Sequence, residues 1–335
     1  MALAPYASTG QRVWYYSFRV ICGLILFFLI APIITIIPLS FNAQDFFTFT
    51  PEMLRLDPEG YSLKHYREFF GTEGSPGLGL IVGLVIGTAG AVALYFWRGA
   101  INVMPIIAGA ALGLIIGKMW GVEGTEWMTP LKNSLKIAPV ATLISVSLGT
   151  LAAIGLSQSH VPFRRAIMAI LISPMIVPLI ISAAGMYFFY SRIGLQGTYW
   201  GVVLSHAALG VPFVIITVTA TLVGFDKSLT RASANLGANP VTTFFRVQMP
   251  LILPGVISGG LFAFITSFDE VVVVLFVGSV GQQTLPWQMF TGLREQISPT
   301  ILAAATVLIS ISVVLLVTLE LLRRRSERLR GMSPS

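Results

Sequence analysis

The sequence predicts an all-α integral membrane protein, and three observations support this fold class. Hydrophobic residues make up 55% of the 335 residues and charged residues only 10%, against about 25% charged residues in soluble globular proteins. The mean hydropathy is +0.83. The apolar segments are each about 20 residues long, enough for a helix to cross a hydrocarbon core of about 30 Å. Because backbone polar groups must be paired within lipid and no alternating barrel pattern is present, these segments are expected to be helices.

The apolar segments predict eight membrane spans. They cover residues 18–39, 78–96, 101–117, 135–157, 166–190, 199–223, 252–278 and 300–322. Arg12 and Arg19 precede the first segment, which is longer than the hydrophobic region of a signal peptide and has no small-residue cleavage site behind it. We therefore expect it to be retained as the first helix.

Lysine and arginine residues predict the orientation, because they are enriched in cytoplasmic loops. With a cytoplasmic N-terminus, one face carries 13 of the 21 basic residues. These are Arg12, Arg19, Arg98, Arg164, Arg165, Lys227, Arg231, Arg246, Arg323, Arg324, Arg325, Arg328 and Arg330. We therefore expect a multi-pass protein of the bacterial cytoplasmic (inner) membrane, in contact with lipid, with both termini in the cytoplasm.

Two segments near the N-terminus differ from the other spans and their loops. Residues 41–77 contain acidic residues, Pro51 and Pro58, so we expect an external loop with a short interfacial helix near Ser62 to Phe70. Residues 1–77 would thus form the first span and its loop. In residues 78–117, small residues recur every four positions, which lets helices approach closely in lipid. We expect a self-packed transmembrane hairpin there, the alternative being a lipid-facing pair with incidental glycines.

Charge and motifs exclude several function classes. The net charge of +7 comes from basic residues at the ends of apolar segments, so nucleic acid is not an expected partner. Cys22 is the only cysteine and the three histidines are scattered, so we expect neither a metal site nor another cofactor. Neither a glycine-rich phosphate loop nor a catalytic triad is found in the sequence. We therefore expect no catalytic residues, and no ATP hydrolysis by this chain itself.

A polar stretch between the sixth and seventh spans carries the clearest functional signal. Asp226 to Pro250 is too long for a tight turn, has an apolar face, and is interrupted at Gly237 and Asn239-Pro240. Pro250 and Pro254 are expected to open the next span. The pattern predicts two short helices that project into the cytoplasm at 226–249 and dock a soluble partner.

This stretch resembles the coupling loop of the permease subunits of ABC importers. That loop has the pattern Glu-Ala-Ala, three variable residues and Gly, followed by a proline-rich helix start. The resemblance implies that the residues that couple to an ATPase are Arg231, Ala232, Ser233, Gly237, Pro250 and Pro254. Arg231 replaces the usual glutamate and Ser233 the second alanine, so a salt bridge made by that glutamate cannot be carried over.

Further motifs outside 78–117 are similar to the second permease of the spermidine/putrescine subfamily. They are Ser40-Phe41-Asn42, residues 133–138, residues 173–178, Ser267-Phe268-Asp269-Glu270, Leu285-Pro286 and Ile297-Ser298-Pro299. The resemblance implies a type I ABC importer fold with six core helices, into which residues 78–117 are inserted, and a permease core at 118–335. It also implies as partners a second permease subunit, two ATP-binding subunits and an external solute-binding protein.

Candidate pathway residues follow from charge and aromatic character within the spans. Asp269 and Glu270 are expected deep in the seventh span, where a carboxylate costs about 2.5–3.5 kcal/mol and so faces a cavity or a partner. They would either ease the passage of a cation or form a structural pair. Tyr187 and Tyr190 could make cation–π contacts with an ammonium group or belong to an interfacial aromatic belt.

The sequence thus predicts a permease that works by alternating access, with a polyamine as substrate. Permeases for amino acids, opines or phosphonates are alternatives within the superfamily. A secondary carrier coupled to an ion gradient through Asp269 or Glu270 is the alternative from another class, although no convincing internal repeat supports it.

Overall fold

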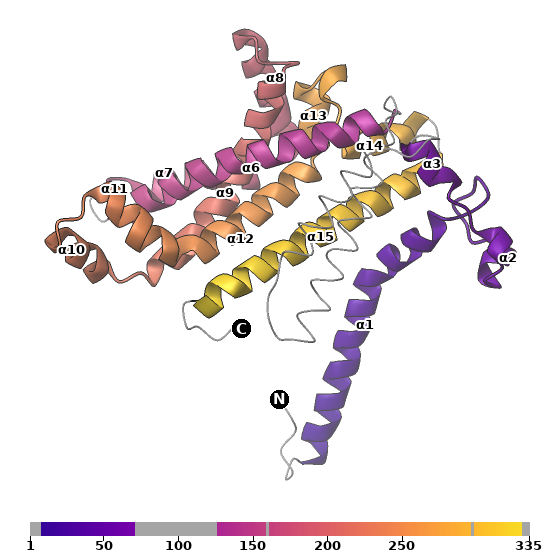
Figure 1. Ribbon diagram of the computed structural model, residues 1–335, viewed down its shortest axis with the longest axis horizontal. Helices are drawn as coiled ribbons and strands as arrows, with labels where there is room; N and C mark the ends of the chain where they lie inside the picture. Colours follow the sequence, from indigo (N-terminus) through magenta and orange to yellow (C-terminus); the bar gives the residue numbers. More distant parts are fainter. Residues whose placement is uncertain (1–7, 71–125, 159–160, 296–297, 330–335) are drawn as a thin grey trace.

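The computed structural model describes residues 8–70, 126–158, 161–295 and 298–329, and this part of the chain is helical (Figure 1). The long helices are α1 (Thr9–Leu39), α6 (Met128–Leu156), α9 (Tyr199–Val223), α12 (Met249–Phe268) and α15 (Thr300–Leu329). Medium and short helices are α3 (Lys64–Phe70), α7 (Arg164–Ile176), α8 (Leu179–Ile193), α10 (Lys227–Asn235), α11 (Pro240–Thr243), α13 (Val272–Val277) and α14 (Leu285–Glu295). Single turns are α2 (Pro51–Leu54), η1 (Pro58–Gly60) and η3 (Val280–Gln282), and η2 (Phe244–Gln248) is a π-helix.

The centre of the molecule is a three-helix core of α6, α9 and α12, which lie side by side (Figure 1). Small residues bring the backbones close together: a Cβ atom at Gly259 of α12 would lie 2.7 Å from the Cα of Val214 on α9. The Ser145 hydroxyl donates to the Ala207 carbonyl at 2.9 Å and so links α6 to α9. Contacts between backbones, together with a few buried hydrogen bonds, therefore define this core.

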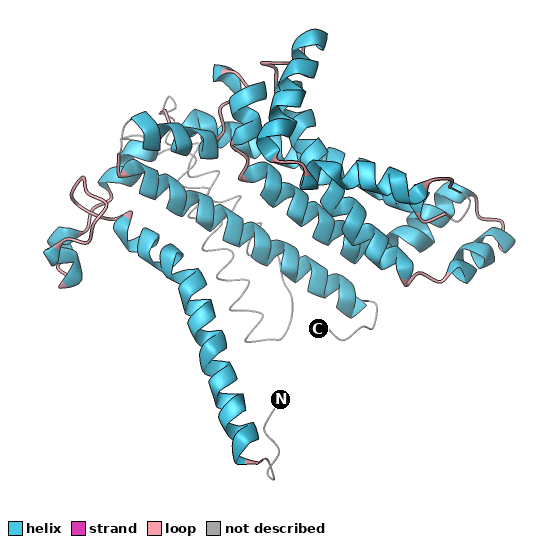
Figure 2. Cartoon of the chain, turned by 180° about the vertical axis from the view of Figure 1, so that it is seen from behind, coloured by secondary structure: helices cyan, strands magenta, loops and turns pink. Residues whose placement is uncertain are grey.

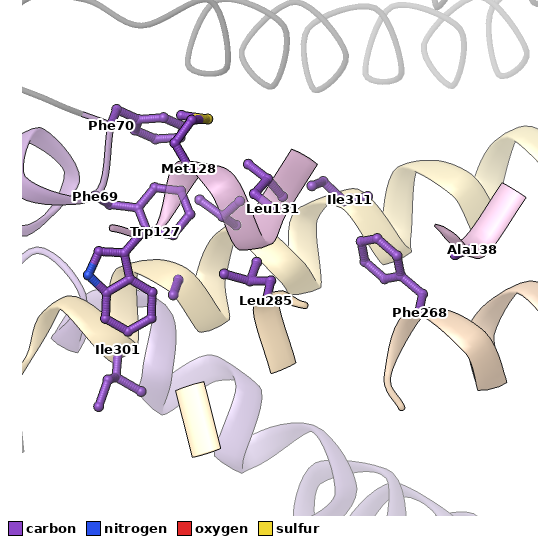
Figure 3. Packing of buried hydrophobic residues seen from close by; sticks show 12 residues of the cluster. Phe69, Phe70, Trp127, Met128, Leu131, Ala138, Phe268, Leu285, Ile301 and Ile311 are labelled. Carbon is purple, nitrogen blue, oxygen red and sulfur yellow. The ribbon is translucent and has the colours of Figure 1, made fainter. Parts of the chain in front are cut away.

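A second cluster closes one end of the bundle, where α3, α6, α14 and α15 meet. Phe69 of α3 lies against Trp127, with ring centroids 6.0 Å apart. Figure 3 shows Phe69, Phe70 and Trp127 gathered beside Met128, close to the start of α6. The predicted helix near Ser62 to Phe70 is confirmed as α3, and its aromatic residues fix the end of the first loop to the core.

Helix α1 lies at the edge of the molecule. Seen from behind in Figure 2, it diverges from the other helices and approaches them only near its C-terminal end. Leu39 is its only buried residue, and Phe28 in its middle is 77% exposed. An apolar helix with this exposure needs lipid or another subunit around it.

The expected span at 166–190 is not one straight helix. The chain bends by 104° between α7 and α8. Val177 is extended (φ −68°, ψ 137°), because Pro178 disfavours helical backbone at the residue before it and has no N–H to continue the helix.

The expected span at 252–278 is also wrong at both ends. At its start, α11, η2 and α12 form one continuous helix from Pro240 to Phe268, so Pro250 does not open a new helix. Pro250 and Pro254 lack N–H donors, and the Met249 N–H bonds to the Phe244 carbonyl in a π-turn beside them. At its end the helix stops at Phe268, so Asp269 and Glu270 lie in a break before α13 and not within a helix.

Four described helices are long and apolar enough to cross a membrane, or five if the bent pair α7–α8 counts as one span. The first and sixth expected spans correspond to α1 and α9, and the fourth and eighth to α6 and α15, although α1, α6 and α15 extend beyond the expected boundaries. The expected hairpin at 78–117 lies outside the described residues.

Candidate functional site

Residues 226–249 form the hairpin that the sequence predicts, at one end of the bundle (Figure 1). Asp226 caps α10: its carboxylate accepts hydrogen bonds from the Ser228 backbone N–H at 2.8 Å and the Ser228 hydroxyl at 2.6 Å. The hydroxyl bond and then the N–H bond lower the pKa of Asp226. The cap is therefore held in its charged form, which suits the positive end of a helix.

The turn of the hairpin depends on Gly237 and Asn239. Gly237 has φ +82°, in the left-handed region, where a side chain is strained although the space around its Cα is open. Asn239 caps α11 by accepting the Thr242 N–H at 2.7 Å. The hydroxyls of Ser233 and Thr243 lie 2.8 Å apart and join the two arms. Local hydrogen bonds and one glycine thus set the shape of the hairpin.

The outer surface of the hairpin is apolar in part. Leu236 is 88% exposed, and Val241 and Phe245 are also exposed. Arg231 and Ala232 are exposed as well, whereas Ser233 is half-buried against Thr243. Pro250 is exposed and Pro254 is half-buried, both within the helix that leads away from the hairpin. An exposed leucine at the tip of a hydrogen-bonded hairpin, with exposed valine and phenylalanine on its second arm, is typical of a surface that binds another protein.

Asp269 and Glu270 lie together in the break between α12 and α13, but they differ in their surroundings. Glu270 is 6% exposed, and its carboxylate accepts the Val273 N–H at 2.8 Å, which starts α13. Asp269 ends α12 and is exposed. Neither carboxylate makes an ion pair with a described side chain. Glu270 therefore has a local capping role, and Asp269 is the residue of the pair that is open to a ligand.

The structure brings only one of the two candidate tyrosines to this break. Tyr190 of α8 packs on the cluster that contains Val273, Val274 and Val277 of α13. Tyr187 contacts Phe188 edge to face, with ring centroids 5.5 Å apart, and is 37% exposed. His206, also within a span, accepts or donates a 2.8 Å bond with the Ser267 hydroxyl and joins α9 to α12.

Sequence reasoning missed an acidic and aromatic cavity of about 270 Å³ at the end of the bundle opposite the hairpin. It is lined by Glu68, Glu126, Trp127, Gln283, Trp287, Gln288, Thr291, Gly292 and Ser298. The Gln288 amide donates to Glu126 at 3.0 Å, and Thr300 donates to Glu68. These residues come from three distant parts of the chain, so no local sequence motif predicts the cavity.

Long apolar helices, a bent helix pair and an exposed hairpin define a multi-pass α-helical membrane protein. The chain belongs to the family described as the binding-protein-dependent transport system inner membrane component, whose model matches residues 145–329, more than half of the chain. It is a permease subunit of an ABC importer, a transport component in a class of systems where a separate subunit hydrolyses ATP.

Curated relatives and a solved structure agree with this family. The chain is 32% identical to the spermidine/putrescine transport system permease protein PotC of Haemophilus influenzae, over 58% of this chain and 76% of that protein. It is 29% identical to the putrescine transport system permease protein PotI of Escherichia coli, over 57% and 74%. The fold resembles a chain of a bacterial ABC transporter that imports the acidic polysaccharide alginate, with a TM-score of 0.56, 15% identity, and coverage of 94% of this chain and 97% of that one.

Proposed function

We propose that this permease imports a polyamine, spermidine or putrescine, across the bacterial inner membrane. The observation that carries the proposal is the identity of 28–32% to permeases named for spermidine and putrescine transport. Two features of the molecule support a cationic substrate. The acidic and aromatic cavity offers two carboxylates and two tryptophans, and Asp269 lies open at a helix break. Carboxylates and aromatic faces are the groups that bind alkylammonium ions.

In this proposal the hairpin at 226–249 is the site where an ATP-binding subunit docks. Its exposed apolar tip and its rigid, locally bonded shape support this role. The partners would be a second permease, two ATP-binding subunits and an external solute-binding protein. Movement of the ATP-binding subunits would then reach the core directly, because the second arm of the hairpin continues as α12.

The proposed topology places the hairpin and both termini in the cytoplasm, with eight spans and residues 78–117 inserted at the edge of a six-helix core. The excess of basic residues on that side supports it. Helix α15 runs from the α3 and α14 end toward the hairpin end (Figure 1), as a cytoplasmic C-terminus requires.

The test is uptake by the assembled transporter in lipid vesicles, with binding protein outside and ATP inside. We expect ATP-dependent accumulation of radiolabelled spermidine or putrescine. Uptake driven by an ion gradient without ATP would favour a secondary carrier. ATP-dependent uptake of an amino acid, opine or phosphonate but no polyamine would overturn the substrate and keep the transporter class.

A further inference from the structure

A second cavity, on the hairpin side of the bundle, is not used by the proposed transport path. It has a volume of about 500 Å³ and lies where the end of α6, the start of α7 and the end of α9 meet. Its lining consists of Leu156, Ser157, Arg164, Arg165, Met168, Thr219, Leu222, Val223 and Phe225. Two adjacent arginines therefore share a space with mostly apolar walls.

Three polar side chains of this cavity lack partners among the described residues, whereas the fourth, Ser157, donates its hydroxyl to the Ile154 carbonyl at 2.7 Å. Arg164 and Arg165 make no ion pair with any described side chain. Thr219 has a buried hydroxyl oxygen that finds no hydrogen-bond partner in the same part of the chain. Two guanidinium groups and a free hydroxyl can together bind the oxygens of a phosphate group.

The apolar walls indicate what carries that phosphate. Leu156, Met168 and Leu222 line the cavity, and Met175, two turns farther along α7 on the same helix face as Met168, is 52% exposed. Helix α7 has no buried residue, so its flank faces the surroundings of the chain along its whole length. A site with a basic head and an apolar flank beside a membrane span matches a phospholipid better than a soluble acidic protein.

The cavity also reaches the hairpin. A neighbouring cavity of about 290 Å³ shares Ser157, Leu222 and Phe225 with it and contains Arg231 and Gln248. A ligand bound by Arg164 and Arg165 would therefore be separated from the hairpin only by the residues that line both cavities.

We propose that Arg164, Arg165 and Thr219 bind the phosphate headgroup of an anionic phospholipid, whose acyl chains lie along α7. The lipid comes from the leaflet on the hairpin side. By filling the space between α7 and the hairpin, the lipid stabilises the conformation of the hairpin, which contacts the ATP-binding subunit. This inference does not depend on the identity of the transported substrate.

The first test uses the transporter with its partner subunits, in nanodiscs of phosphatidylcholine alone or mixed with phosphatidylglycerol. Retained lipid is measured by native mass spectrometry after transfer to detergent. We expect retention of phosphatidylglycerol, weakened about 30-fold by Arg164→Gln with Arg165→Gln, since each basic contact at a membrane surface contributes about one kcal/mol. The matched control, Arg67→Gln with Arg192→Gln, removes two exposed arginines outside the cavity and should retain lipid normally. Equal retention in both double variants would overturn the site.

The second test needs no variant, so it stands even if the arginine substitutions prevent folding. Arginines of the wild-type transporter are modified with phenylglyoxal and located by mass spectrometry. We expect phosphatidylglycerol to protect Arg164 and Arg165 but not Arg192, and inorganic phosphate at the same concentration to protect neither. Equal protection by phosphate would assign the cavity to a free anion. Protection that is seen only when the ATP-binding subunits are bound, with or without phosphatidylglycerol, would show that those subunits cover the two arginines. Either of these two results would overturn the lipid site.

Discussion

The three-helix core and the hairpin are held together in different ways. In the core, α6, α9 and α12 touch through glycines, so the position of each backbone depends on distant parts of the chain. In the hairpin, caps from Asp226 and Asn239 and a left-handed Gly237 set the shape locally. The hairpin can therefore leave its apolar residues exposed for a partner without losing its own structure. The core cannot expose its apolar residues in this way, because the packing of those residues against one another forms its interior.

The largest expected effect falls on the core. Gly259→Leu would place a Cβ against the Thr217 hydroxyl and 2.7 Å from the Val214 Cα, and backbone cannot move aside as a flexible side chain can. Overpacking of this kind costs about 1–3 kcal/mol or more. We expect loss of most folded protein, measured by thermal unfolding in detergent. Gly155→Leu, where a Cβ meets nothing within 4 Å, is the control. A melting temperature for Gly259→Leu equal to that of the control would refute tight packing between α9 and α12.

The next largest effect falls on the turn of the hairpin. Gly237→Leu forces a side chain into left-handed backbone, at a cost of about 1–2 kcal/mol, and distorts the docking tip without touching the core. We expect at least about tenfold slower ATP-dependent uptake, with folding and membrane insertion intact. Gly224→Leu is the matched control, since Gly224 also has open space but a φ of −88°. Full uptake by the Gly237 variant would count against docking through this turn.

A smaller effect is expected from replacement of the acidic pair, because only Asp269 is exposed to a ligand, whereas Glu270 is buried. Asp269→Asn with Glu270→Gln removes charge and keeps size, and the amide introduced in place of the Glu270 carboxylate still offers an oxygen to the Val273 N–H. An ammonium group about 4 Å from a carboxylate gains on the order of 4 kcal/mol at a dielectric near 20, before desolvation. We expect uptake of spermidine to fall about tenfold, most of it from Asp269.

The control for the acidic pair is subunit assembly, measured on the same preparations at saturating binding protein. Normal assembly with unchanged uptake would remove both residues from the pathway. Lost assembly would show that the pair is structural.

The smallest effect is expected from deletion of residues 78–117. That this segment forms an inserted transmembrane hairpin remains a prediction. The family model matches residues 145–329, and this segment lies outside that match. We expect assembly and ATP-dependent uptake within about twofold of wild type, a change of about 0.4 kcal/mol. Complete loss of uptake by an assembled deletion variant would place the segment in the transport core.

The sequence predicted those features that depend on local chemistry. The turn of the hairpin was predicted from Gly237, Asn239 and Pro240, and α1 and α9 were predicted from long runs of apolar residues. It failed where a break interrupts a hydrophobic segment: residues 252–278 are mostly apolar and contain no charged residue except Asp269 and Glu270, so their composition indicates one span. The helix ends at Phe268, and the Glu270 carboxylate accepts the Val273 N–H in the first turn of α13, which begins at Val272. The acidic and aromatic cavity was missed because Glu68, Glu126 and Trp287 meet only through tertiary packing.

The central claim is that the hairpin, and not the opposite end of the bundle, receives the ATP-binding subunit. It is tested by replacing Cys22, the only cysteine, with serine and introducing Leu236→Cys at the tip of the hairpin or Leu63→Cys just before α3. Both leucines are exposed, at 88% and 53%. A short heterobifunctional reagent is attached to the introduced cysteine of the assembled transporter through its maleimide end. Its photoreactive end, which needs no thiol on the partner, is then activated by light. We predict a cross-link to the ATP-binding subunit from position 236 and none from position 63. A cross-link to that subunit from position 63, with none from 236, would contradict the assignment of the hairpin and the orientation of the whole chain.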